Sequence, residues 1–461
     1  MPESPCFDID GEKLEYVGDA TEGLCGEKMG DIDEKKAPVA CAIEASRSPS
    51  SEDLLVISIN ASVAVFVVDT MTASTALSLP TFATAISCRV RGDRIEVAAC
   101  LASGCVALFV FDLFTSGYKP NKKEYRIVHE EFEHATACSF LHQGDTPTAG
   151  RRKIDERCCD LCVCTDAGEV VFYYFDEDED LNEPDVSNIK WEKKDNRKWE
   201  RATFSRSNPP CAWRIFDESI TAIHVHDGKS TTGGEGSEGS EVEITEGDVD
   251  HRDGEAGPKL HLMAIANKKG AVLVFDMKDL SLLYILESFF GAILAVSISW
   301  DATLIATGGE DDTVVLWNAE DGHLLAAGEK HRARVRGLAF DRHSGGHGVK
   351  LVSVGEDRRV VWYSFDWDKK RRDRTISFPT SVLSSTSAGG GGGTADRGRQ
   401  GQKGDRNSVR HIVAGRPAES PDLPSICTSM AHPDPLLSVH CLPSCVVTVS
   451  WDRRAAVWKR P

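Results

Sequence analysis

Residues 291–331 read GAILAVSISWDATLIATGGEDDTVVLWNAEDGHLLAAGEKH, and this stretch decides the fold. Its first segment, AILAVSISW, alternates apolar and small polar side chains, which is typical of a half-buried strand. LIATGGEDD predicts a second strand that ends in a tight acidic turn, and TVVLWNAEDG predicts a third strand that closes on Trp317. LLAAGEKH predicts a fourth strand and a loop that ends at His331. Four short antiparallel strands in this order predict one blade of a β-propeller.

The same plan recurs along the chain. The next unit contains VRGLAFDRH, KLVSVGEDR and RVVWYSFDW, and the last contains LLSVHCL, CVVTVSWDRR and AAVWKRP. Earlier units begin with VACAIEA, AISCRVRG, TACSFLHQ and SITAIHVHDG. The length of the unit and the order of its strands match a WD40 repeat. The sequence therefore predicts an all-β fold, a seven-bladed WD40 β-propeller over residues 38–461.

The last unit reaches residue 461 after only three strands. A ring of blades protects its strand edges when every blade is complete. We therefore expect the polar N-terminal segment, residues 1–37, to contribute residues 13–17 as the missing outer strand.

Two long insertions interrupt the repeats. Residues 229–258 are acidic and rich in Gly and Ser, and residues 369–420 are basic and rich in Gly. Both segments carry few apolar side chains, so we expect them to be disordered. The KKRRDR run at 369–374 is either a nuclear-localisation or nucleic-acid motif or simply a solvated basic loop, and the sequence leaves both possibilities open.

The composition indicates a protein that interacts mainly with other proteins. Its net charge is −19 over 461 residues, which disfavours binding to nucleic acid or to an anionic membrane. No apolar run approaches the roughly 18 residues that a membrane span needs, and the N-terminus is acidic and polar. We expect the protein to lie in the cytoplasm or the nucleus.

Fifteen cysteines are scattered mostly through apolar strands, and the dense group is Cys158, Cys159, Cys162 and Cys164. A structural zinc site needs four ligands, and the chain has no second CxxC pair to complete one. We interpret these cysteines as core residues and expect no metal and no cofactor.

Several blades carry residues of the types that form the structural hydrogen-bond set of WD40 repeats. The sixth unit has His331, Ser353 and Asp357, and the fifth has Asp311 and Trp317. The last unit has His432, Thr448, Asp452 and Trp458. His331, Ser353 and Asp357 could be taken for a catalytic triad. The same residue types recur in another blade, however, and no nucleophile-elbow motif accompanies them. We therefore expect no catalytic residues and no small-molecule substrate.

The central blades resemble a known family. The stretch LLYILESFFGAILAVSISWDATLIATGGEDDTVVLWNAEDGHLLAAGEKHRARVRGLAFD is similar to the WD-repeat protein twenty family, which includes the fungal CreC and dystrophia-myotonica WD-repeat proteins. The segment SNPPCAWRI at 207–215 resembles the family's Asn-Pro…Trp segment, and the C-terminal SICTSMAHPDPLLSVHCLPSCVVTVSWDRRAAVWKRP resembles its last blade.

The resemblance implies a regulatory subunit that binds and activates a ubiquitin-specific protease, in company with a second WD40 protein. It also implies that Phe290 lies on the rim that faces the partner. The next loop carries Arg332, Arg334 and Arg336, and Arg334 stands where the family has an aromatic residue. We take these four residues as the candidate partner-binding set.

Two other functions remain open at this stage. Trp451-Asp452-Arg453 superficially resembles a docking box of ubiquitin-ligase substrate receptors, although it falls at a turn between strands. The basic insertion is compatible with an RNA-associated protein, but it lacks interleaved aromatic residues.

Deleting residues 230–257 should leave the melting temperature almost unchanged, because this segment lacks core-forming side chains and blade loops tolerate changes in length. Thermal melts of the full chain and of the deletion variant test this expectation. A large drop would show that the segment packs against the propeller.

Overall fold

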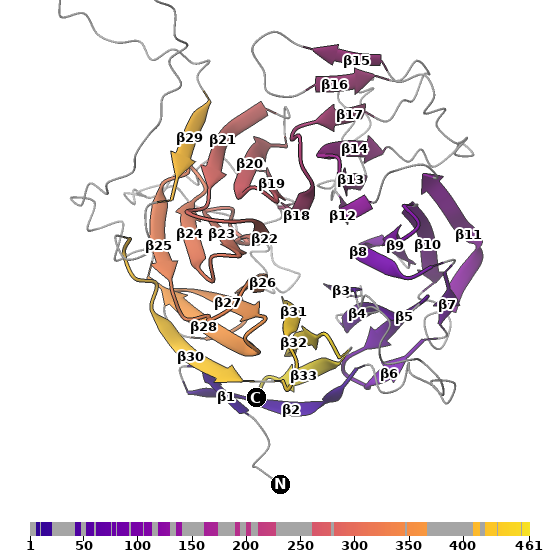
Figure 1. Ribbon diagram of the computed structural model, residues 1–461. Helices are drawn as coiled ribbons and strands as arrows, with labels where there is room; N and C mark the ends of the chain where they lie inside the picture. Colours follow the sequence, from indigo (N-terminus) through magenta and orange to yellow (C-terminus); the bar gives the residue numbers. More distant parts are fainter. Residues whose placement is uncertain are drawn as a thin grey trace, which may run out of the picture.

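The computed structural model describes residues 6–9, 11–20, 42–47, 52–59, 61–74, 76–79, 81–91, 94–104, 106–112, 119–129, 135–140, 161–173, 190–193, 200–203, 211–226, 261–277, 281–345, 348–366, 409–414, 420–430, 432–452 and 454–461. These residues form seven sheets around a central axis, and none of them lies in a helix (Figure 1). The predicted all-β, seven-bladed propeller is confirmed.

Each sheet is one blade, and the blades are numbered here in chain order. Blade 1 comprises β3 (Ala42–Arg47), β4 (Asp53–Ile59), β5 (Ser62–Val67), β6 (Thr72–Ala73) and β7 (Leu77–Ser78). Blade 2 comprises β8 (Ala83–Arg91), β9 (Arg94–Leu101), β10 (Val106–Asp112) and β11 (Lys119–His129). Blade 3 comprises β12 (Ala135–Phe140), β13 (Leu161–Thr165), β14 (Glu169–Tyr173), β17 (Cys211–Arg214), β16 (Glu200–Thr203) and β15 (Lys190–Lys193). Blade 4 comprises β18 (Ile220–Val225), β19 (Leu262–Asn267), β20 (Ala271–Asp276), β21 (Ser281–Glu287) and β29 (Arg410–Val413). Blade 5 comprises β22 (Ile293–Ile298), β23 (Leu304–Gly309), β24 (Val314–Asn318) and β25 (Leu324–Gly328). Blade 6 comprises β26 (Val335–Asp341), β27 (Val349–Gly355), β28 (Arg359–Phe365) and β30 (Ser425–Met430). Blade 7 comprises β31 (Leu436–Cys441), β32 (Cys445–Ser450), β33 (Ala455–Lys459), β2 (Glu12–Asp19) and β1 (Cys6–Ile9).

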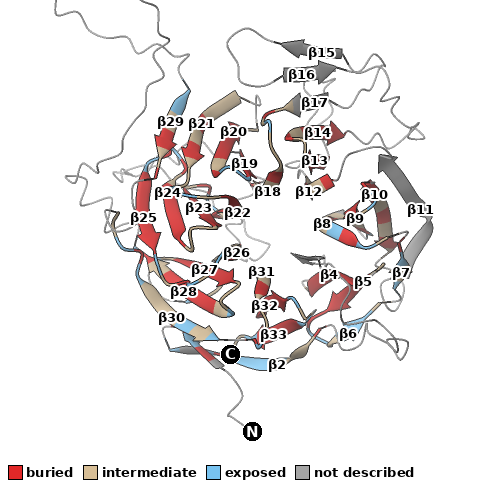
Figure 2. Ribbon diagram, viewed as in Figure 1, coloured by how far each residue is buried: buried red, intermediate tan, exposed pale blue. Residues whose placement is uncertain are grey.

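The core is divided among the blade interfaces, and each of the seven interfaces holds one cluster of buried apolar side chains. Strand β23 shows how one strand contributes to two clusters. Ile305 packs toward blade 4, whereas Leu304 and Ala306 pack toward blade 6. Successive side chains of a strand point to opposite faces, so a blade between two neighbours buries both faces. Figure 2 shows buried residues along the inner and middle strands and exposed ones on parts of β2, β29 and β30.

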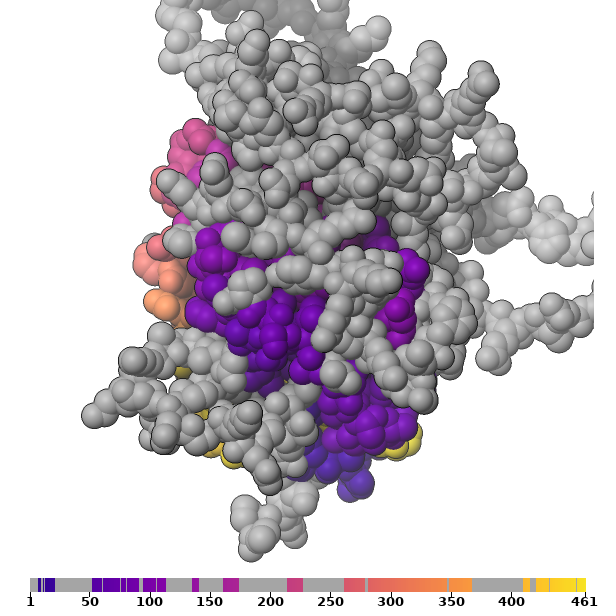
Figure 3. Space-filling view, turned by 90° about the vertical axis from the view of Figure 1, so that its right-hand side faces the viewer, coloured from indigo at the N-terminus to yellow at the C-terminus, as the bar shows by residue number. Residues whose placement is uncertain are grey.

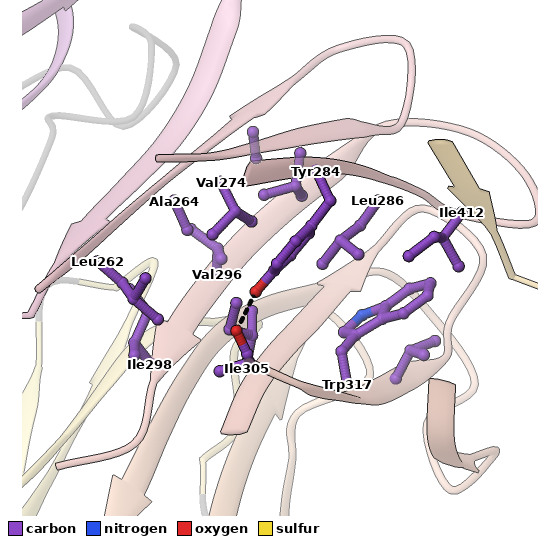
Figure 4. Packing of buried hydrophobic residues seen from close by; sticks show 14 of the residues in the cluster. Leu262, Ala264, Val274, Tyr284, Leu286, Val296, Ile298, Ile305, Trp317 and Ile412 are labelled. Atoms are coloured by element: carbon purple, nitrogen blue, oxygen red, sulfur yellow. Dashed lines mark hydrogen bonds between the residues drawn. The ribbon is translucent and has the colours of Figure 1, made fainter. Parts of the chain in front are cut away.

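Trp317 lies in the cluster between blades 4 and 5 and is completely buried. Its indole Nε1–H donates a hydrogen bond of 2.9 Å to Thr307 Oγ1 on the adjacent strand. In the same cluster, the hydroxyl of Tyr284 donates to the carbonyl oxygen of Ala319 at 2.5 Å (Figure 4). The two aromatic side chains thus bury their rings and still satisfy their polar atoms.

The N-terminal segment joins the last blade. Strand β2 pairs antiparallel with β33, and β1 adds a fifth strand outside β2. The indigo N-terminal residues therefore lie beside the yellow C-terminal ones (Figure 3). The expected strand at 13–17 falls inside β2, whereas the preceding strand β1 was not expected. Its Phe7 ring lies 4.5 Å from the rings of both Trp362 and Trp458, so the hairpin also contacts blade 6.

Polar contacts near the end of the chain connect blade 7 to both of its neighbours. Arg460, after the last strand, forms an almost completely buried ion pair of 2.7 Å with Asp341 of blade 6. On the other side, the backbone N–H and hydroxyl of Ser444 donate to Asp53 of blade 1 at 2.8 and 2.6 Å.

The first predicted insertion, residues 229–258, lies outside the described residues, as does 369–408 of the second. The prediction that 369–420 is disordered throughout is wrong at its C-terminal end. Residues 410–413 form β29, which pairs in parallel with the outer strand β21 of blade 4. Asp422 then bridges to Ala327 of blade 5 before β30 completes blade 6 (Figure 1). Ile412 explains why residues 410–413 adopt an ordered strand, because its side chain is buried in the cluster that contains Trp317.

Replacing Trp317 with alanine should destabilise the fold by about 3–5 kcal/mol, because the substitution leaves a cavity at the interface of blades 4 and 5. Denaturant unfolding of the variant and the unchanged chain measures the difference. A loss below about 1 kcal/mol would contradict the burial of this ring between blades.

Candidate functional site

The candidate residues lie on the face of the ring where the chain crosses from one blade into the next, here called the inter-blade face. A backbone hydrogen bond that recurs in several blades defines this face. In it, the N–H of the residue after the second strand donates to the carbonyl oxygen of the residue before the first strand. Glu310 N–H donates to Ala292, Glu356 N–H to Arg334 and Trp451 N–H to Pro435, each at 2.9 Å. The inter-blade loops and the turns after the second strands therefore share this face.

Phe290 lies in the loop that enters blade 5, and its side chain is strongly exposed, at 70%. Phe289, which the sequence reading did not select, is exposed at 48%. Neighbouring exposed aromatic residues are uncommon away from binding surfaces. The two phenylalanines form what we call the aromatic pair.

The three candidate arginines occupy different environments on this face. The guanidinium of Arg334 pairs with Glu310 at 3.2 Å, and that of Arg336 pairs with Glu356 at 2.7 Å. Arg332 is exposed, and its backbone N–H donates to Asp357 Oδ2 at 2.9 Å. Two of the three positive charges are thus balanced by glutamates that the sequence reading did not identify.

Glu310 connects the arginine loop to the loop of the aromatic pair. Its Oε1 accepts the ion pair from Arg334, and its Oε2 accepts the backbone N–H of Ala292 at 3.2 Å. An exposed ion pair of this kind contributes little to stability, but together with the bond to Ala292 it shows that the two loops are neighbours. The structure therefore brings Phe290 and Arg334 to adjacent places on one surface.

Below this surface, blade 6 holds His331, Ser353 and Asp357 in one hydrogen-bonded set. His331 Nε2 lies 2.6 Å from Ser353 Oγ, and its Nδ1 lies 3.0 Å from Asp357 Oδ1. Burial alone raises the pKa of the Asp357 carboxyl. The hydrogen bond and the charge of His331, together with two backbone N–H donors, lower it by more, so this pKa lies below its usual value. Ser353 is fully buried, so a substrate cannot reach its hydroxyl, and the set stabilises the blade.

Blade 7 brings together three of the four residues selected there. Thr448 Oγ1 is 2.8 Å from both His432 Nε2 and Trp458 Nε1. The fourth, Asp452, bonds within its own turn instead, where its carboxylate pairs with Arg454 at 3.1 Å.

Blade 5 contains Trp317 and Asp311 but has no histidine at the matching place. Asp311 accepts the backbone N–H of Thr313 at 3.2 Å within its turn, while Trp317 bonds to Thr307. Burial raises the pKa of the Asp311 carboxyl to about 6, and the turn hydrogen bonds lower it only in part. The same aspartate position therefore has opposite pKa shifts in blades 5 and 6.

Two further exposed aromatic residues lie on the inter-blade face, and neither was among the predicted partner-binding residues. Trp451 follows β32 and is exposed at 43%, and Phe82, which precedes β8, is exposed at 38%. Phe82 accepts the repeated backbone hydrogen bond from Ala102 at 3.0 Å, which places it on the same face. The sequence showed Trp451 only as part of a resemblance to a docking box, and it gave no comparable signal for Phe82.

The described part of the chain contains no cluster of His, Cys, Asp and Glu side chains that could hold a metal. Cys162 and Cys164 are buried between blades 3 and 4 and form no disulfide, whereas Cys158 and Cys159 lie outside the described residues. Among the residues described, no helix has the length and apolarity that a membrane crossing requires.

Comparison with known proteins agrees with this architecture. The WD40 family pattern (WD domain, G-beta repeat) matches residues 281–318, which run from β21 to the end of β24. The chain is similar to UBP9-binding protein bun62 of Schizosaccharomyces pombe, with 26% identity over 212 residues, or 44% of this chain and 39% of that protein. It is also similar to the WD repeat-containing protein 20 homolog of Caenorhabditis elegans, with 32% identity over 130 residues, or 28% of this chain and 16% of that protein.

The chain is a WD40-repeat protein similar to WD repeat-containing protein 20. Its matches span less than half the length of either relative. Among solved structures, a chain of the "Crystal Structure of Mitotic Checkpoint Complex" superposes with a TM-score of 0.50 at 12% identity, covering 93% of this chain and 96% of that one. At this identity the superposition shows the shared fold alone. The repeat match and the two relatives support a WD40 protein of the scaffold type.

The opposite pKa shifts of Asp311 and Asp357 predict opposite effects of replacing each with asparagine. The Asp311 pKa lies above its unfolded value of 3.8, so its carboxylate disfavours folding above about pH 6. Asp311→Asn keeps the acceptor for Thr313 and should raise the melting temperature near neutral pH, with the gain shrinking as the pH falls toward 4.

The pKa of Asp357 is lowered, so its carboxylate stabilises the fold above its unfolded pKa. Asp357→Asn should therefore lower the melting temperature near neutral pH, and the loss should shrink in acid. Thermal melts at a series of pH values from about 4 to about 7.5 measure both effects. Shifts of the same sign for the two variants at neutral pH would contradict this account.

Proposed function

We propose that this WD40 protein is a regulatory subunit that binds a ubiquitin-specific protease through its inter-blade face and activates it. The observation that carries the proposal is the aromatic pair, whose Phe290 is the most exposed large apolar residue of the described chain. The name of the relative bun62, a UBP9-binding protein, supports a protease of this class as the partner.

The chemistry of this face suits a protein interface. Interfaces favour exposed aromatic residues and arginine, with a few anchors contributing most of the binding energy. Here Glu310 links the loop of the aromatic pair to Arg334, and the exposed Arg332 lies in the same loop as Arg334. Trp451 of blade 7 and Phe82 of blade 2 are further exposed aromatic residues on the same face of the ring. A second WD40 protein in the same assembly remains part of the proposal.

Activation requires no catalytic residue from the propeller. A rigid partner can raise the activity of an enzyme by favouring its competent conformation, to the extent that it binds that conformation more tightly. Affinity purification of the tagged chain followed by mass spectrometry identifies the bound protease. Hydrolysis of a fluorogenic ubiquitin substrate by that purified protease, with and without the chain, then measures activation.

The double variant Phe290→Ala and Arg334→Glu should abolish co-purification of the protease. The first change removes an anchor worth about 2 kcal/mol or more, and the second places a glutamate opposite Glu310 and reverses the charge of the rim. The fold should persist, because both side chains are exposed loop residues.

The matched control is Glu320→Gln in the turn between β24 and β25, which changes an exposed charge on the opposite face of blade 5. It should leave both binding and melting temperature unchanged. Unchanged affinity of the double variant, with an intact fold, would refute the site. Failure to recover any ubiquitin-specific protease with the unchanged chain would refute the proposed function.

A further inference from the structure

Blade 5 differs from blades 6 and 7 at one position of the hydrogen-bond set. His331 lies four residues before the first residue of β26, and His432 lies four residues before the first residue of β31. Counting back in the same way from β22 gives Phe289. The two histidines are buried, at 6% and 7% exposure, whereas Phe289 is 48% exposed. The phenylalanine thus replaces a buried hydrogen-bonding residue and remains at the surface.

The aspartate beneath this position has no cationic partner in the described chain. The matching aspartates both have one: Asp357 lies 3.0 Å from His331, and Asp452 lies 3.1 Å from Arg454. The Asp311 carboxylate accepts the backbone N–H of Thr313 in its own turn. The Thr313 hydroxyl donates to the Asp311 carbonyl oxygen instead, and no described side chain donates to the carboxylate. A carboxylate that is partly removed from water without a partner is unfavourable, and a positive charge brought beside it would relieve this cost.

Two carboxylates in the turn after β23 have no ion-pair partner in the described chain. Glu310 is paired with Arg334 and Glu356 with Arg336, so these pairs are balanced. Asp311 and its neighbour Asp312 take part in no ion pair within the described residues. These two carboxylates are therefore complementary to a cation.

We propose that this histidine-less position of blade 5 binds an arginine side chain of the partner, which lies against Phe289 and Phe290 and pairs with Asp311. The proposal rests on the proposed function, since the partner is the ubiquitin-specific protease. A guanidinium suits the position because it stacks on aromatic rings, pairs with carboxylates through a planar fork and is weakly hydrated. The partner's arginine takes the place on Asp311 that His331 takes on Asp357.

The test uses small probes on the full-length chain, so it does not depend on the protease. Methyl-labelled chain is titrated with acetyl-arginine amide and, separately, with acetyl-citrulline amide, which has nearly the same shape but no charge. Signals of Ile293, Thr307 and Val314 around the position should respond to the arginine probe roughly tenfold more strongly than to the citrulline probe, as expected for a charge-assisted pair. Equal responses to the two probes would overturn the proposal.

Two variants locate the response. Phe289→His should supply the missing imidazole from the chain itself, which raises the melting temperature and removes the arginine response. Asp311→Asn removes the charge and should also abolish the response, and it remains informative if the first variant folds poorly. Glu320→Gln, on the opposite face of the blade, should retain the response. An arginine response that survives Asp311→Asn would place the probe elsewhere and refute the site.

The protease experiment separates this inference from the proposed function. Phe289→His and Asp311→Asn should each weaken binding of the recovered protease roughly tenfold without loss of fold. If no protease binds the unchanged chain, the proposed function fails, while the amide titration still decides whether the position binds a cation. If the protease binds both variants with unchanged affinity, its arginine does not occupy the position and the inference fails.

Discussion

The structure depends on the packing of each blade between two others. A single four-stranded sheet has two apolar faces, and it cannot bury both of them alone. The seven clusters of buried side chains show the solution, because each belongs to a pair of neighbouring blades. The cluster between blades 7 and 1 closes the ring, so the two ends of the repeat series stabilise each other. No blade can be removed without exposing two apolar faces.

Ring closure explains the importance of contacts made by both ends of the described chain. β2 completes the sheet of blade 7, and Phe7 of β1 packs between Trp362 and Trp458. Toward the same neighbour, blade 6, the buried pair of Arg460 and Asp341 is satisfied by further hydrogen bonds, including one from Arg460 to Ser344. A buried ion pair adds less to stability than to the uniqueness of the arrangement, since only one geometry satisfies it. These contacts specify which blades are neighbours at the closure.

The rigid ring leaves its inter-blade face free to vary. Loops on that face carry few core contacts, so they can present aromatic or charged side chains at low cost to the fold. The buried hydrogen-bond sets beneath the loops hold each turn in place, as His331 does for Asp357. Blade 5 has Phe289 in place of that histidine, and the consequence is a surface with an exposed aromatic pair above a carboxylate of raised pKa. Blade 5 therefore differs chemically on this face from blades 6 and 7, which follow it in the chain.

The sequence by itself determined the number of blades, the place of most strands and the members of the hydrogen-bond set in blade 6. These features are local, since strand alternation and turn residues are written in stretches of about ten residues. It also placed Phe290 and Arg334 on neighbouring loops. Only the tertiary structure decided that Glu310 and Glu356 neutralise two arginines, that Phe289 stands in a histidine position, and that Ile412 anchors a parallel strand on blade 4. Each of these depends on groups that are distant in sequence, or on the alignment of one blade with the next, and no local pattern of residues encodes such distances.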